Sequence, residues 1–138
     1  MSCIEWGDAY SVCVEFLDED HKQLFALLRK ADDACKLDTQ TENYPLIVNE
    51  LVSYLLNHFA AEEGYMNKIK YPDIAAHKHE HELFYNRVLA FQQKIYENKE
   101  DYTKDMLDLT ETLSHWLHHH ILNVDQQYTN FVVLSYFK

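Results

Sequence analysis

Histidine is concentrated near the end of the chain in a pattern that could bind a metal. The segment HWLHHHILNVD, residues 115–125, places four histidines within six residues and ends on an aspartate. Imidazole suits iron, zinc and copper, and a carboxylate often completes such a site. Because successive residues of an α-helix point about 100° apart, the four imidazoles cannot all reach one ion. Their positions relative to the apolar face therefore decide which of them could be ligands.

Only His120 shares the apolar face of its helix. The main apolar residues of this segment fall within about 60° of His120 on a helical wheel. The other three histidines lie about 100° to 160° away, beside polar and charged residues; they are His115, His118 and His119. We therefore expect His120 to point into the core and the other three to face water.

The three earlier helical segments also turn polar, metal-binding side chains toward their apolar stripes. These side chains are His21, His58, Glu62, His77 and His81. A single histidine on an apolar face is usually structural, but burying so many groups without partners would cost about 1–3 kcal/mol for each. One metal site would satisfy them together. Metal binding is therefore favoured over a set of independent structural histidines.

Asp125 tests this interpretation because it lies five residues after His120. In a regular α-helix, that spacing turns the carboxylate about 140° away from the imidazole. If both side chains face one site, the helix must end nearby or widen to i to i+5 hydrogen bonding, as in a π-bulge. We predict such a distortion or a helix end at residues 120–125.

The distribution of prolines and polar segments predicts an all-α chain. Pro45 and Pro72 suit the first turn of a helix, where a missing N–H costs nothing. Polar segments at 37–43 and 98–101 are short enough to join antiparallel neighbours. We expect a single domain, an up-down-up-down antiparallel four-helix bundle, with helices at about 18–36, 45–69, 72–97 and 103–125.

Two segments flank the expected bundle, which spans residues 18–125. Residues 1–17 are predicted to form an extended arm whose aromatic side chains pack on the helices. Residues 126–138 form a tail, and its apolar part, 131–137, is expected to dock on the bundle. The protein is expected to be a monomer, with a contact between two copies through this tail as the alternative.

Composition limits the class of partner. The 138 residues suffice for one packed core, and the net charge of −11 repels phosphate backbones and anionic membranes. We therefore expect neither nucleic acid nor membrane as a partner. The three cysteines form no C-x-x-C motif, and no signal peptide or spanning segment is evident. A cytoplasmic protein with reduced thiols is expected.

Five short motifs together resemble those of the hemerythrins, in particular the single-domain bacteriohemerythrins. They are LDEDHKQLF at 17–25, HFAAEE at 58–63, MNKIKYP at 66–72, HKHEH at 77–81 and WLHHHILNVD at 116–125. The resemblance covers nearly the whole chain. One departure is Asp20, where glutamine is usual; because it lies off the core stripe, we expect it to alter surface charge more than the metal site.

The resemblance implies a non-heme centre of two iron ions joined by an oxo or hydroxo bridge. One iron would be bound by three imidazoles, those of His77, His81 and His120, and the other by two, those of His21 and His58. The carboxylates of Glu62 and Asp125 would bridge the two irons. With six positions on each iron, these ligands leave one position open on the two-histidine iron. One small molecule would fit there.

The function that the resemblance implies is reversible dioxygen binding, for storage, delivery or sensing, with no catalytic residue. In the family, apolar residues line the ligand pocket, and the matching positions are Leu24, Phe59, Trp116, Leu117 and Ile121.

Four alternatives stay open at this point. A di-iron redox enzyme could act on nitric oxide or peroxide at the same open position, although the Glu-x-x-His signature of ferritin-like oxidases is absent. The segment 77–81 also matches the H-x-x-E-H metalloprotease pattern, which leaves the histidines of the other helices unexplained. The remaining alternatives are a metal-binding protein without oxygen chemistry and a purely structural bundle.

Overall fold

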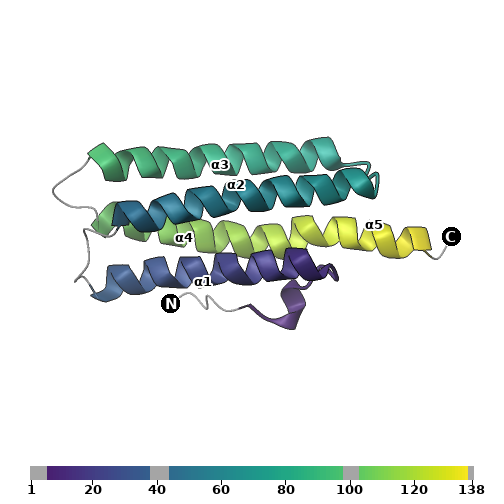
Figure 1. Cartoon of the computed structure of the whole chain (residues 1–138), viewed down its shortest axis with the longest axis horizontal. Helices are drawn as coiled ribbons and strands as arrows, with labels where there is room; N and C mark the ends of the chain where they lie inside the picture. The colour runs from purple at the N-terminus through teal and green to yellow at the C-terminus, as the bar shows by residue number, and fades with distance from the viewer. Residues whose placement is uncertain (1–5, 38–43, 98–102, 137–138) are drawn as a thin grey trace.

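Four long helices form an antiparallel bundle in the computed structural model, which describes residues 6–37, 44–97 and 103–136. Each helix packs against the next along the chain, and the fourth packs back against the first. Figure 1 shows their axes side by side, with connections at alternating ends. The predicted up-down-up-down bundle is confirmed, with helices α1 (Glu15–Leu37), α2 (Tyr44–Lys68), α3 (Ile74–Glu97) and α4 (Thr103–His119).

The helix boundaries differ from the expected ones for local reasons. Helix α1 begins three residues early, and the carboxylate of Asp18, inside its first turn, accepts hydrogen bonds from the Ser11 hydroxyl and the Val12 N–H. Pro72 precedes α3 instead of lying in its first turn, because the chain turns through Lys70 with a positive φ. The two polar connections lie almost wholly outside the described residues.

The N-terminal arm is less extended than predicted. A short 3₁₀ turn, η1 (Asp8–Tyr10), interrupts it, and the last three residues assigned to the arm, Glu15, Phe16 and Leu17, already belong to α1. The arm nevertheless packs on the bundle: Val12 is buried, and Trp6 and Tyr10 lie against the core.

The C-terminal tail is helical. Helix α5 (Gln126–Tyr136) continues the line of α4 and extends past the neighbouring helices (Figure 1). Its inner side docks through buried Tyr128 and half-buried Phe131. Of the apolar part 131–137 that was expected to dock, Val133 and Leu134 are instead exposed. Whether these residues join two copies of the chain stays a prediction.

Apart from Thr110 and Ser114 on α4, the buried polar and charged side chains of the described residues gather at one place in an otherwise apolar interior. The main cluster of buried apolar residues runs through all four helices, and a smaller one lies under α5. Between them, five imidazoles and two carboxylates are buried. No helix in the described ranges has the length and apolar character needed to cross a membrane.

Candidate metal centre

A local change of helix type brings His120 and Asp125 to the same site. Residues His120–Asp125 form a π-helix, η3, between α4 and α5. This widening cancels the 140° offset of a regular helix, and His120 Nε2 lies 3.0 Å from Asp125 Oδ1. The predicted i to i+5 distortion is confirmed.

Three imidazoles and two carboxylate oxygens form the tighter half of the centre. The Nε2 atoms of His77 and His81 each lie 3.1 Å from His120 Nε2. Glu62 Oε1 lies 3.0 Å from His77 Nε2 and 2.9 Å from His81 Nε2. Asp125 Oδ1 lies 3.0 Å from the Nε2 atoms of His77 and His120. These five atoms all lie within 4.8 Å of one another.

Two further imidazoles form the looser half. His21 Nε2 lies 3.5 Å from Glu62 Oε2 and 3.3 Å from Asp125 Oδ2. His58 Nε2 lies 3.6 Å from Glu62 Oε2, and the His21 and His58 rings meet edge to face at 4.5 Å. Each carboxylate therefore presents one oxygen to the three-histidine group and the other to the two-histidine group.

The spacing and burial of these atoms fit metal binding. Adjacent ligands of an octahedral ion with bonds of about 2.1 Å are about 3.0 Å apart, close to the distances in the three-histidine group. His21 and Asp125 are fully buried, yet neither His21 nitrogen nor either Asp125 oxygen makes a hydrogen bond of acceptable geometry. Such groups need a partner, and a cation between the two sets of lone pairs would supply one.

In the absence of a metal, the imidazoles and carboxylates of the centre strongly affect one another's pKa values. Burial opposes ionisation of Glu62 and Asp125, but the surrounding imidazoles outweigh it and lower both carboxyl pKa values. Burial likewise disfavours protonated imidazole, but hydrogen bonds to carboxylates raise the pKa of His58 and of His77 to about 9. Without a metal, His58, His77 and the two buried carboxylates therefore stabilise one another's charged forms.

Three acidic residues, which sequence reasoning did not identify, orient ligand-type imidazoles from behind. The Nδ1–H of His58 donates to Asp20 at 3.2 Å, that of His81 to Glu63 at 2.9 Å, and that of His120 to Glu80 at 3.1 Å. These bonds leave each Nε2 free to face the centre.

The contacts of Asp20 and Glu80 bear on two interpretations made from the sequence, the surface role of Asp20 and the metalloprotease alternative. Asp20 was expected to alter surface charge more than the metal site, but it contacts His58 and also accepts a hydrogen bond from the Tyr54 hydroxyl. The hydrogen bond from His58 is the largest influence that lowers the pKa of Asp20, and the bond from His120 does the same for Glu80. Glu80, the acid of the H-x-x-E-H pattern, therefore supports His120, and this geometry gives no support to the metalloprotease alternative.

Tyr128 is a further residue that the sequence analysis did not assign to the site. Its hydroxyl donates to Glu62 Oε2 at 3.0 Å, and its ring stacks against His77 at 5.9 Å. Burial raises its pKa, so the hydroxyl stays protonated and donates. The Tyr65 ring packs edge to face on the Tyr128 ring.

Substitution Tyr128→Phe should weaken metal binding while the fold is retained. The change removes a hydrogen bond to a carboxylate, worth about 1.5–3 kcal/mol, and the loss of such a support typically costs about 10–100-fold in metal affinity. Titration against a competing chelator measures this effect. Tyr85→Phe, which removes a half-buried hydroxyl on α3, is the control; equal affinities of the two variants would contradict the role of Tyr128.

The apolar residues predicted to line a ligand pocket all lie in or against the main core: Leu24, Phe59, Trp116, Leu117 and Ile121. Phe59 stacks on His81 at 4.0 Å, and Trp116 stacks on His120 at 4.1 Å. Aromatic side chains therefore cover one face of His81 and one face of His120.

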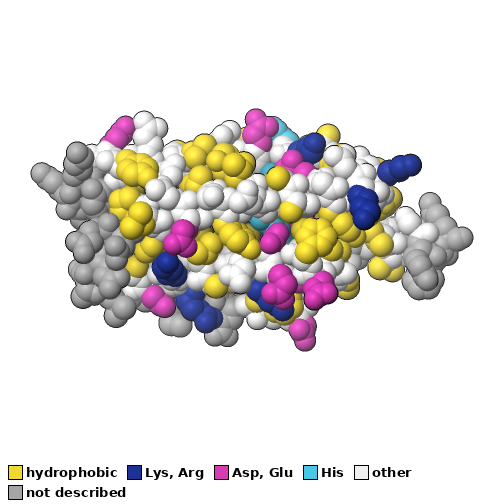
Figure 2. Space-filling model, viewed as in Figure 1, with side chains coloured by type: hydrophobic (Ala, Val, Ile, Leu, Met, Phe, Trp, Pro, Cys, Tyr) yellow, Lys and Arg dark blue, Asp and Glu magenta, His cyan; other side chains and the backbone are white. Residues whose placement is uncertain are grey.

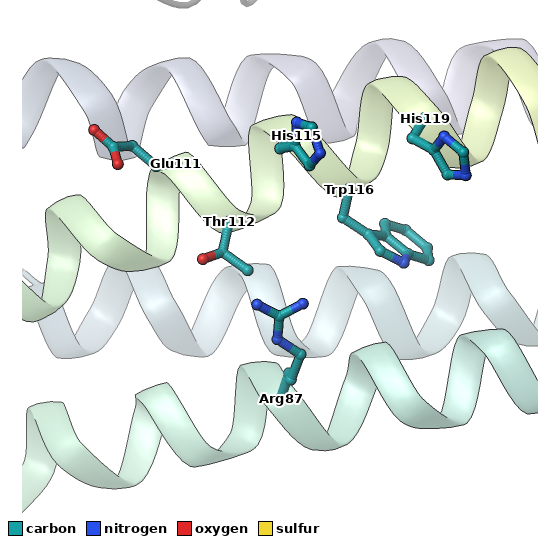
Figure 3. A pocket seen from close by; sticks show the side chains of 6 residues that line it. All are labelled: Arg87, Glu111, Thr112, His115, Trp116 and His119. Atoms are coloured by element: carbon teal, nitrogen blue, oxygen red, sulfur yellow. The ribbon is translucent and has the colours of Figure 1, made fainter.

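The remaining histidines of the 115–120 cluster differ from one another. His115 and His119 are exposed, as predicted, and line a surface groove of about 550 Å³ with Arg87 and Trp116. Figure 3 shows Arg87 and Trp116 extending into the space between α3 and α4. His118 was expected to face water, but it is half-buried, because its Nδ1 pairs with the Tyr10 hydroxyl of the arm.

The fold and the site define a class of protein: a four-helix bundle with a buried centre of imidazoles and shared carboxylates. Little imidazole surface is visible on the face drawn in Figure 2. Residues 13–132 match the Hemerythrin HHE cation binding domain family, so the chain belongs to the hemerythrin family.

Individual relatives agree with this assignment. The chain is 32% identical over 127 residues to the bacteriohemerythrin of Clostridium acetobutylicum, covering 89% of this chain and 96% of that protein. It is 30% identical over 129 residues to the bacteriohemerythrin of Methylococcus capsulatus, covering 93% and 95%. A crystal structure of wild-type hemerythrin superposes with a TM-score of 0.81 at 29% identity, covering 94% of this chain and 97% of that one. Hemerythrin family proteins bind oxygen.

Proposed function

We propose that the chain binds dioxygen reversibly at a non-heme centre of two iron ions. The observation that carries this proposal is the division of both buried carboxylates between two groups of imidazoles, a tight group of three and a looser group of two. That arrangement suits two ions side by side better than one. Membership of the hemerythrin family supports iron as the metal and dioxygen as the ligand.

The proposed ligands are those expected from the sequence. The first iron would be held by His77, His81 and His120, the second by His21 and His58, and Glu62 and Asp125 would bridge them. When bound, the iron pair supplies two electrons and an open position for a small ligand. Because fewer protein atoms converge on the two-histidine group, the open position is assigned to that side.

The residues of this chain would keep the bound ligand away from protons and water. Leu24, Leu117 and Ile121 are buried apolar residues of the core and donate no hydrogen bond through their side chains. Phe59 and Trp116 cover two imidazoles of the three-histidine group with flat aromatic surface. A dry environment without a proton donor favours release of the ligand over its reduction. We therefore propose binding without turnover as the main activity.

An anaerobic optical titration tests the proposal. We expect two irons per chain, a nearly colourless reduced protein, and colour that appears on exposure to oxygen and disappears again under argon. One zinc per chain with no optical change would contradict the iron proposal. Rapid, repeated consumption of peroxide or nitric oxide would favour the redox-enzyme alternative.

A further inference from the structure

The five ligand-type imidazoles are supported unequally on the side that faces away from the centre. Three of them donate their Nδ1–H to an acidic side chain of the preceding helix: His58 to Asp20, His81 to Glu63 and His120 to Glu80. For His77 and His21, Nδ1 is buried and makes no hydrogen bond within the described part of the chain. The acids therefore act on both groups of the centre.

Each of these acids lies where its hydrogen bond increases electron donation from the imidazole to a bound metal. A carboxylate that accepts the Nδ1–H bond raises the basicity of the ligating Nε2. The three acids keep part of their surface in water, with side-chain exposures of 28% for Asp20, 26% for Glu63 and 36% for Glu80. Each acid therefore contacts water on one side and a buried imidazole on the other, and the three carboxyl groups lie close to a centre that already holds two carboxylates.

The electrostatic consequence depends on the charge of the metal. A more basic ligand and a nearby negative charge both stabilise an ion more as its positive charge increases. The ferric state gains more from the three acids than the ferrous state does. The acids therefore favour loss of electrons from the metal pair.

We propose that Asp20, Glu63 and Glu80 lower the reduction potential of the centre through their hydrogen bonds to three of its imidazoles. This inference rests on the proposed iron function and concerns how readily the metal pair gives up electrons to dioxygen. The competing side reaction is autoxidation, in which water enters the site: dioxygen takes one electron from each ferrous ion and two protons from that water, and it leaves as hydrogen peroxide.

The test is redox potentiometry of iron-loaded protein carrying Glu80→Gln, Glu63→Gln or Asp20→Asn. Each amide keeps an oxygen that can accept the Nδ1–H bond but removes the charge. We expect each variant to lower the preference for ferric iron about tenfold, a rise of about 59 mV per electron, and to slow autoxidation to a similar degree. Iron content is measured in parallel.

Glu82→Gln is the matched control, because Glu82 is an exposed acid on the same helix, two residues from Glu80. This variant removes the same charge, and the reduction potential of its metal centre should stay unchanged. Unchanged potentials in the three variants, or an equal rise in the control, would overturn the inference. Loss of iron from all three would also overturn it, because the acids would then be needed for assembly. A parent protein without iron would instead contradict the proposed function itself.

Discussion

His120→Ala is expected to reduce the metal content from two ions per chain to one, whereas His119→Ala is expected to leave it unchanged. The two residues are adjacent, but His120 is buried and its Nε2 lies within 3.1 Å of two other imidazole nitrogens, while His119 is exposed at the groove. Loss of His120 removes one of three imidazoles from the tighter group. Metal analysis by mass spectrometry under native conditions measures the stoichiometry directly.

The His119→Ala control separates ligation from loss of any histidine in the cluster. Because His120→Ala also removes the stacking on Trp116, helical content is checked by circular dichroism. Two metals in folded His120→Ala protein, or metal loss in His119→Ala protein, would contradict the ligand assignment. A half-loaded His120→Ala protein would be consistent with the two-histidine group binding on its own.

Removal of the metal is expected to lower Tm by more than about 10 °C. A ligand that binds only the folded state stabilises it by about 4 kcal/mol when its free concentration is 1,000 times Kd, and each kcal/mol shifts Tm by about 4 °C in a domain of this size. The structural reason is the set of buried atoms on His21 and Asp125 that make no hydrogen bond within the described residues. Calorimetry of chelator-treated and reloaded protein measures the difference; equal Tm values would contradict a buried metal site.

The stabilising contributions in the metal-free and the metal-loaded protein should change in opposite directions as pH rises. In the metal-free protein, hydrogen bonds to carboxylates outweigh burial and raise the pKa of His58 and of His77 to about 9, above the ~6.5 of an unfolded chain. Because the folded state binds these protons more tightly, this contribution is complete below about pH 6.5 and is lost as pH rises through about 9.

Metal binding requires neutral imidazoles, so the stabilisation that a metal supplies increases over the same range. The gap in Tm between the loaded and metal-free forms is therefore expected to widen between pH 6 and pH 9. Calorimetry at fixed ionic strength and metal concentration measures this gap. A gap that narrows with rising pH would show that the imidazoles are not the ligands.

Local sequence predicted the helices and the inward-facing imidazoles because both depend on the 3.6-residue period. His120 could be separated from His115 and His119 by angle alone, and the five-residue spacing to Asp125 required a break in regular geometry. The π-helix at 120–125 is the physical result of placing both side chains in one core. The sequence was less informative at boundaries, where Asp18 and Lys70 make contacts or turns that periodicity does not register.

The supporting residues were decided only by the tertiary structure. Each of the three acids stands next to a proposed ligand in the sequence, as Asp20 does to His21, yet it contacts an imidazole of the next helix. Tyr128 reaches Glu62 from a segment 66 residues away, and His118 is covered by an arm 108 residues away. The sequence alone therefore determined which face each helix buries, because that depends on neighbours within a few turns. The tertiary structure decided which atoms meet, because hydrogen-bond partners on different helices depend on how the helices pack.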